Sequence, residues 1–97
     1  MTKYKFDEDR ILTELRQYID STYSAHYSGE NDIQSMEVIF DDSDGLGFCR
    51  GNILKYVRRY GKKKGHNRDD LFKTLHYAML LLYDHDKERS DENSHSG

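Results

Sequence analysis

Apolar residues recur at helical spacing along most of the chain. Ile11, Leu12 and Leu15 fall on one side of a 3.6-residue period and are joined by Tyr18 and Ile19. The acidic run Asp7-Glu8-Asp9 precedes them and suits the positive end of a helix. The spacing therefore predicts a first amphipathic helix of about 14 residues.

The middle of the chain predicts a loop and two further helices. Ser21 to Asp32 reads as a loop, and Ser35 to Phe40 as a short helix, with a strand over Val38–Phe40 as the alternative. A third helix is predicted from about Gly47 to Tyr60, and Gly61 stands where a C-terminal cap glycine is expected. The apolar side of that helix consists of Cys49, Ile53, Tyr56, Val57 and Tyr60.

A fourth helix is predicted to open at Asp69 or Asp70. Its inward stripe is expected to be Leu71, Leu75, Ala78 and Leu82, and further apolar residues lie off that stripe at Tyr77, Leu80, Leu81 and Tyr83. Such a surplus is typical of a central helix surrounded by the others or of a homo-oligomer interface. Beyond Tyr83 the chain is polar and without periodicity, so we expect a disordered acidic tail.

These elements predict an all-α fold, a small bundle of about four helices in one domain over residues 1–83, with a tail over 84–97. The chain has 97 residues, of which 35% are apolar and 34% charged, so a monomer would have a thin core and association is a common remedy. The single Cys49 excludes an intramolecular disulfide and fits a reducing cytoplasm. No signal peptide or membrane span is predicted, because the longest apolar run is Ala78 to Tyr83.

The charge is unevenly distributed. Eight of the 15 Lys and Arg residues lie between Arg50 and Arg68, where there is no acidic residue, although the whole chain carries a formal charge of -3. On the third helix Asn52, Lys55 and Arg59 share one flank of the apolar stripe, and this donor set suits a phosphate. The basic turn after the helix adds Lys62, Lys63 and Lys64 to the candidate anion site, and Tyr56 and Tyr60 are candidate stacking platforms for a base.

A solvated face with ordinary salt bridges to acidic residues such as Glu37, Asp41, Asp42 and Asp44 remains the alternative for this basic flank. A Walker lysine motif is absent, and Gly45 to Gly51 departs from the dinucleotide fingerprint by one residue. The paired carboxylates that all-helical nucleotide pyrophosphohydrolases use for magnesium are also missing, and no metal ligand set is predicted. Duplex nucleic acid is disfavoured as a partner because the pI of the chain is near 5.9.

The run Gly51-Asn52-Ile-Leu-Lys55-Tyr56-Val-Arg-Arg59-Tyr-Gly61-Lys62-Lys63, followed by Asp70-Leu71-Phe-Lys73, resembles a small phage family called SaV-like. Its pattern is G-N-x-x-K-Y-x-x-R-x-G-K-K followed by D-L-x-K-A-x-W-Y-L. A related segment occurs in a podophage nucleotide kinase that lacks a Walker loop. The resemblance implies a phage origin and a nucleotide ligand. Thr74 and His76 depart from the alanine and tryptophan of the pattern.

Three hypotheses follow. The first is a nucleotide- or phosphate-binding protein that acts in the host cytoplasm on nucleotide pools or nucleotide signals, without catalysis and without a cofactor. The second is a nucleoside monophosphate kinase that would need magnesium. The third is a non-enzymatic inhibitor that docks on a host protein through its acidic or apolar surface, since Glu30 to Asp44 holds six acidic residues and no basic one.

Overall fold

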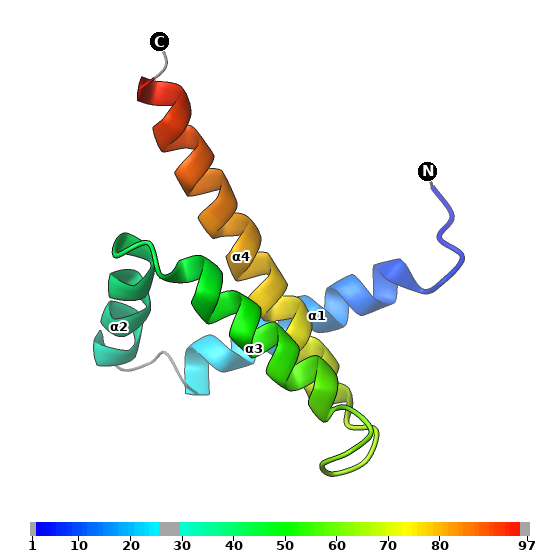
Figure 1. Cartoon of the computed structure of the whole chain (residues 1–97). Helices are drawn as coiled ribbons and strands as arrows, with labels where there is room; N and C mark the ends of the chain where they lie inside the picture. The colour runs from blue at the N-terminus through cyan, green and yellow to red at the C-terminus, as the bar shows by residue number, and fades with distance from the viewer. Residues whose placement is uncertain (1, 26–29, 96–97) are drawn as a thin grey trace.

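The computed structural model describes residues 2–25 and 30–95, and the side chains of residues 2–24 and 36–89. Four helices follow one another along the chain, and no strand occurs in the described residues (Figure 1). They are α1 (Glu8–Ala25), α2 (Glu30–Asp41), α3 (Gly45–Arg59) and α4 (Arg68–His95). The prediction of a small all-α bundle is therefore confirmed.

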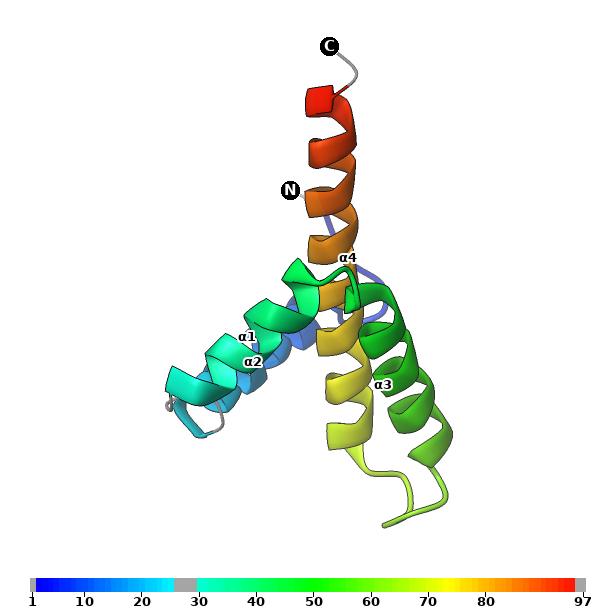
Figure 2. The same cartoon turned by 60° about the vertical axis from the view of Figure 1, so that its left-hand side comes forward.

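Helices α3 and α4 form an antiparallel hairpin that is the most closely packed part of the molecule. The two views show α3 lying along the first half of α4, with the loop of residues 60–67 at one end (Figures 1 and 2). Tyr77 of α4 packs against two rings of α3: its ring stacks on Tyr56 at 5.9 Å between centroids and meets the edge of Phe48 at 5.7 Å.

Helices α1 and α2 join the hairpin through aromatic contacts with α4. Tyr18 of α1 stacks on Phe72 at 5.5 Å, and Phe40 of α2 meets Tyr83 edge to face, also at 5.5 Å. The buried apolar side chains in the described part of the chain are Leu15, Phe40 and Cys49. The core is thin, as the composition predicts for an isolated chain.

The start of α3 is built around a close approach to α4. A Cβ on Gly45 would lie 2.5 Å from Oδ1 of Asp84, so a larger residue at this point would have to displace the Asp84 side chain. The Asp84 carboxylate is buried and stands near the helix N-terminus, where the macrodipole favours a negative charge. The preceding turn places Ser43 at φ 66°, in the left-handed region. This packing sets the direction in which the chain turns from α2 into α3.

The observed helices are longer than the predicted ones. Helix α1 continues to Ala25 and α2 begins at Glu30, so most of the loop predicted over Ser21–Asp32 is helical, and residues 26–29 lie outside the described residues. The alternative of a strand over Val38–Phe40 is wrong, because α2 runs through it. Helical period and strand alternation are hard to separate in so short an apolar segment.

Helix α4 also extends past the predicted end of the periodic segment at Tyr83, because it continues to His95. Asp84 is buried against the start of α3, and Nζ of Lys87 donates to Asp41 at 2.8 Å. These contacts hold the first turn after Tyr83 in the fold, and no Gly or Pro interrupts the helix before its end. The backbone of residues 84–95 is therefore helical where a disordered tail was expected.

The orientation of α4 differs from the prediction as well. The stripe expected to face inward, Leu71, Leu75, Ala78 and Leu82, is exposed. The residues that contact α3 are instead Asp70, Lys73, Tyr77 and Asp84. Polar and aromatic contacts therefore decide which side of α4 faces the hairpin partner. None of the described helices has the length and apolar character needed to cross a membrane.

Candidate functional site

Three cationic side chains converge on the ring of Tyr56. Nζ of Lys55 and Nζ of Lys73 each lie 5.0 Å from the ring centre, and the guanidinium carbon of Arg59 lies 5.9 Å from it. Lys55 and Arg59 come from α3, whereas Lys73 comes from α4. We call Lys55, Tyr56, Arg59 and Lys73 the cation cluster. The negative face of an aromatic ring attracts cations, and this attraction helps to hold them together.

The cluster has a rigid aromatic support. Tyr56 stacks nearly parallel on Tyr77, with an angle of 9° between the rings. Tyr77 is in turn held by the edge of Phe48. Tyr77 of α4, which Phe48 of α3 holds in turn, therefore positions the ring of Tyr56. The ring then positions the cations around it.

Arg59 also faces a buried carboxylate of α4. Its Nε lies 3.8 Å from Oδ1 of Asp70, a side chain that is only 3% exposed. This separation is too long for a hydrogen bond. Nε of Arg59 and Oδ2 of Asp70 are both buried without a hydrogen-bond partner. The ion pair anchors Arg59 from the side of α4.

The two lysines have no such anchor. Among the described residues, neither Lys55 nor Lys73 forms an ion pair with a carboxylate. Lys73 is half-buried, whereas Lys55 is exposed. The alternative of ordinary salt bridges on this flank therefore does not describe these two side chains, and the cluster carries an excess of positive charge.

The lysines of the basic turn lie at the tip of the hairpin. The turn is closed by a hydrogen bond from the N–H of Gly61 to the carbonyl of Gly65, 2.8 Å long, and Lys64 adopts φ 60°. Lys62, Lys63 and Lys64 are all exposed and follow directly after the Arg59 end of the cluster. They extend the positive field, but no contact joins them to Tyr56.

The remaining predicted residues have local partners. Nδ2 of Asn52 donates to the carbonyl of Phe48 at 2.9 Å, so its amide is engaged with its own helix. Tyr60 meets the ring of His66 at 5.1 Å and is more than a third exposed. Tyr56 is engaged by Tyr77 and by the cations. Tyr60 is consequently the more accessible of the two candidate stacking residues.

Lys73 was not named as a site residue by the sequence reasoning, and Asp70 was placed at the start of the fourth helix without a role beside Arg59. A signal for both exists in the hairpin itself. In an antiparallel hairpin, residues equally far from the turn lie opposite each other, and the turn here is centred between Lys64 and Gly65. Arg59 then faces Asp70, and Tyr56 faces Lys73, as the structure has it.

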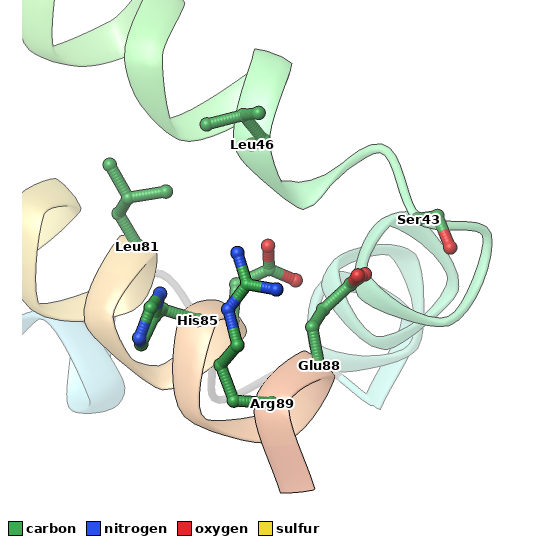
Figure 3. Close-up of a pocket in the computed structure, with 7 residues that line it drawn as sticks. Ser43, Leu46, Leu81, His85, Glu88 and Arg89 are labelled. Atoms are coloured by element: carbon green, nitrogen blue, oxygen red, sulfur yellow. The ribbon is translucent and has the colours of Figure 1, made fainter. Parts of the chain in front are cut away.

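A cavity of about 370 Å³ lies beside the start of α3, away from the cation cluster. Figure 3 shows Glu88 and Arg89 pointing from α4 toward the α2–α3 turn and the first turn of α3. The lining of this cavity includes Asp84, whose Oδ1 is buried without a hydrogen-bond partner. Two carboxylates in the lining make this cavity less suited to an anion than the cation cluster.

Cys49 lies beneath this region and is fully buried. Burial raises the pKa of the Cys49 thiol, and the nearby Asp84 carboxylate raises this pKa further. A thiol held in its neutral form is a poor nucleophile. Across the part of the chain that the structure describes, no three His, Cys, Asp or Glu side chains gather as a metal site.

The fold and the site define a small all-α protein with a basic helical hairpin. The chain belongs to the family described as a protein of unknown function (DUF3310), whose family model matches residues 21–79. The matched range includes α3 and the part of α4 that carries Asp70, Lys73 and Tyr77. Comparison with curated proteins and with solved structures gives no match.

Proposed function

We propose that the protein binds a nucleotide or another phosphorylated small molecule at the cation cluster. One observation carries the proposal: Lys55 and Lys73, from two helices, direct their ammonium groups to one tyrosine ring and form no ion pair in the described residues. Each Nζ lies 5.0 Å from the ring centre, so the two ammonium groups are at most about 10 Å apart. Like charges within this distance repel each other, and a bound anion relieves that repulsion. The cluster is therefore suited to an anion.

Phosphate fits the donor set better than a carboxylate does. Two ammonium groups supply point charges, and the guanidinium of Arg59, which is about a quarter exposed, supplies further donors. The basic turn with Lys62, Lys63 and Lys64 adds positive potential at one end. Several cations along one flank favour a ligand with several negative oxygens, such as a nucleoside di- or triphosphate.

The base of such a nucleotide would use the aromatic surface next to the cluster. Tyr60 directly follows Arg59, and its ring and that of His66 form an exposed pair. The resemblance to a small phage family suggests a biological setting in which the protein withdraws a host nucleotide or nucleotide signal by binding it. In this proposal the protein needs no catalytic step.

Native mass spectrometry with pooled mono-, di-, tri- and cyclic nucleotides tests the proposal, followed by calorimetry with the retained class. The Lys55→Gln/Lys73→Gln variant should bind at least about 10-fold more weakly, since a hydrogen bond to a charged group contributes about 1.5–3 kcal/mol. The control is Arg50→Gln/Arg58→Gln, which removes the same charge from exposed positions of α3. Retention of no nucleotide, or equal losses in both variants, overturns the proposal.

The same preparation distinguishes binding from turnover. Incubation of the retained nucleotide with ATP and magnesium should leave it unchanged if the protein only binds it. Formation of ADP would replace the proposal by the kinase alternative, which the podophage resemblance suggests. If no nucleotide is retained at all, docking on a host protein becomes the hypothesis to pursue.

A further inference from the structure

The exposed side of α4 carries a continuous apolar stripe. Leu71, Leu75, Ala78 and Leu82 are spaced by four, three and four residues, so they lie on one side of the helix. Their exposure rises from 37% at Leu71 to 60% at Leu82. This spacing is the one by which helices pair along a coiled-coil seam. In the part of the chain that the structure describes, the leucines of this stripe therefore remain more than a third exposed.

The stripe lies on the side of the hairpin away from the cation cluster. Residues two positions apart on an α-helix point about 200° apart, so Leu71 and Leu75 both point away from Lys73, which lies between them. By the same geometry Val57 of α3 points away from Lys55 and Arg59, and it is also exposed. One face of the hairpin is thus cationic and the opposite face is apolar.

The chain as a whole exposes more surface than a stable monomer of its size. Its accessible surface is 7607 Å². A monomeric protein of 11.5 kDa is expected to expose about 5,800 Å². The excess, about 1,800 Å², falls in the range that each chain of a permanent homodimer buries, about 1,000–2,500 Å². Part of this excess belongs to segments that project from the hairpin, such as the end of α4 (Figure 1), and the exposed leucines of the stripe are the apolar part that a second copy of the chain would cover.

We infer that two copies of this chain associate through the α4 stripe, with the two α4 helices antiparallel. A twofold axis between positions 76 and 77 brings Leu71 opposite Leu82 of the partner and Leu75 opposite Ala78 of the partner. Both layers are then apolar and self-complementary. The cation clusters of the two copies remain on the outer faces, so this dimer and the proposed nucleotide site are independent.

The charged residues beside the stripe favour the antiparallel orientation of the two α4 helices. Arg68 and Asp86 lie on the same flank of α4, because they are five helical turns apart. In the antiparallel pair Arg68 of one copy, whose guanidinium also pairs with Glu14 of its own chain at 2.7 Å, lies near Asp86 of the other. In a parallel pair Arg68 stays level with Arg68 of the other copy and lies about five helical turns from either Asp86, so this attraction is absent. Such rim charges select the orientation rather than supply affinity.

Sedimentation velocity and native mass spectrometry across a concentration series test the association. The wild-type protein should be a dimer, and Leu75→Glu and Leu82→Glu should each shift it to the monomer with the helical circular dichroism retained. Val38→Glu is the matched control, because Val38 is 56% exposed on α2, and it should stay dimeric. A monomeric wild type overturns the inference, as does a dimer that survives both glutamates. If Leu75→Glu fails to fold, the more exposed Leu82→Glu decides.

Disulfide formation between introduced cysteines tests whether the two α4 helices are antiparallel. Leu75→Cys chains mixed with Ala78→Cys chains should form a mixed disulfide under mild oxidation, because the two positions face each other in the antiparallel pair. Ala78→Cys chains alone should link poorly. Cys49 does not interfere because it is fully buried. Efficient linkage of Ala78→Cys chains to each other would instead establish a parallel pair and overturn the antiparallel arrangement.

Discussion

Arg59 and Asp70 face each other across the α3–α4 hairpin, with Nε 3.8 Å from Oδ1, directly above the loop that joins the helices. The carboxylate is buried, and the guanidinium is about three-quarters buried. Attraction between opposite charges is stronger in such a setting than at the surface. The pair therefore locks the end of α3 that carries the cation cluster against α4.

Asp70→Asn should destabilise the fold by about 2–3 kcal/mol. Removing one partner of a fully buried pair costs about 3–5 kcal/mol, and Arg59 retains some contact with water, which lowers the expected loss. Urea unfolding measures this loss in the free energy of unfolding. Asp69→Asn is the control, since Asp69 is an exposed residue of the same helical turn and shares the macrodipole effect. Equal losses in the two variants would contradict a structural role for the ion pair.

Two glycines of α3 should respond oppositely to alanine. A Cβ on Gly45 would lie 2.5 Å from Oδ1 of Asp84 and 2.7 Å from Cδ1 of Phe40, so Gly45→Ala should destabilise the fold by about 1–3 kcal/mol. No atom lies within 4 Å of the corresponding point at Gly51. Gly51→Ala should therefore stabilise the helix by about 0.5–1 kcal/mol. Thermal unfolding compares the two, and a stabilising Gly45→Ala would show that α3 does not approach α4 so closely.

Lys73 is the cleanest single test of the proposed ligand site. Arg59→Ala would also break the ion pair with Asp70, so its effect on binding would mix two causes. Lys73→Gln leaves that pair in place and should reduce nucleotide affinity about 10-fold, with little change in the free energy of unfolding. Calorimetry at two salt concentrations should also show a weaker salt dependence in the variant, since one cation is lost. Unchanged affinity would remove Lys73 from the site.

The sequence predicts the helices well, but it does not predict how they face each other. The apolar spacing located α3 and the start of α4 within about two residues, because each helix has a strong period and clear end signals. The inward side of α4 could not be found from its leucines. The helix instead turns Tyr77 and Asp70 toward α3, and the leucines of the stripe lie outside.

The site was predicted only from its α3 half for the same reason. Asn52, Lys55 and Arg59 share a flank of one helix, which a helical period reveals. Only the hairpin brings Lys73 next to Lys55 and Arg59. The position of Lys73 therefore depends on the length and symmetry of the turn, which contains Gly61 and Gly65 at positive φ. Contacts between helices depend on such turn geometry, which residue spacing within one helix does not report.

Burial of His76 gives the fold a dependence on pH. The side chain is buried between α1 and α4, where Tyr18 meets it edge to face at 6.3 Å, and burial lowers the pKa of His76 in the folded state. In the unfolded chain its pKa returns to about 6.5, so the unfolded state binds more protons below that pH. Stability contributed by neutral His76 is therefore fully present above about pH 6.5 and is lost as the pH falls below it.

Urea unfolding at about pH 7.5 and pH 5.5 measures this dependence. The wild-type protein should be less stable at the lower pH, and His76→Gln should remove part of the difference because glutamine does not titrate. His85→Gln, at an exposed position of the same helix, is the matched control and should keep the wild-type difference. If His76→Gln and His85→Gln change the pH dependence equally, the effect comes from general charge, and burial of the His76 imidazole is not its cause.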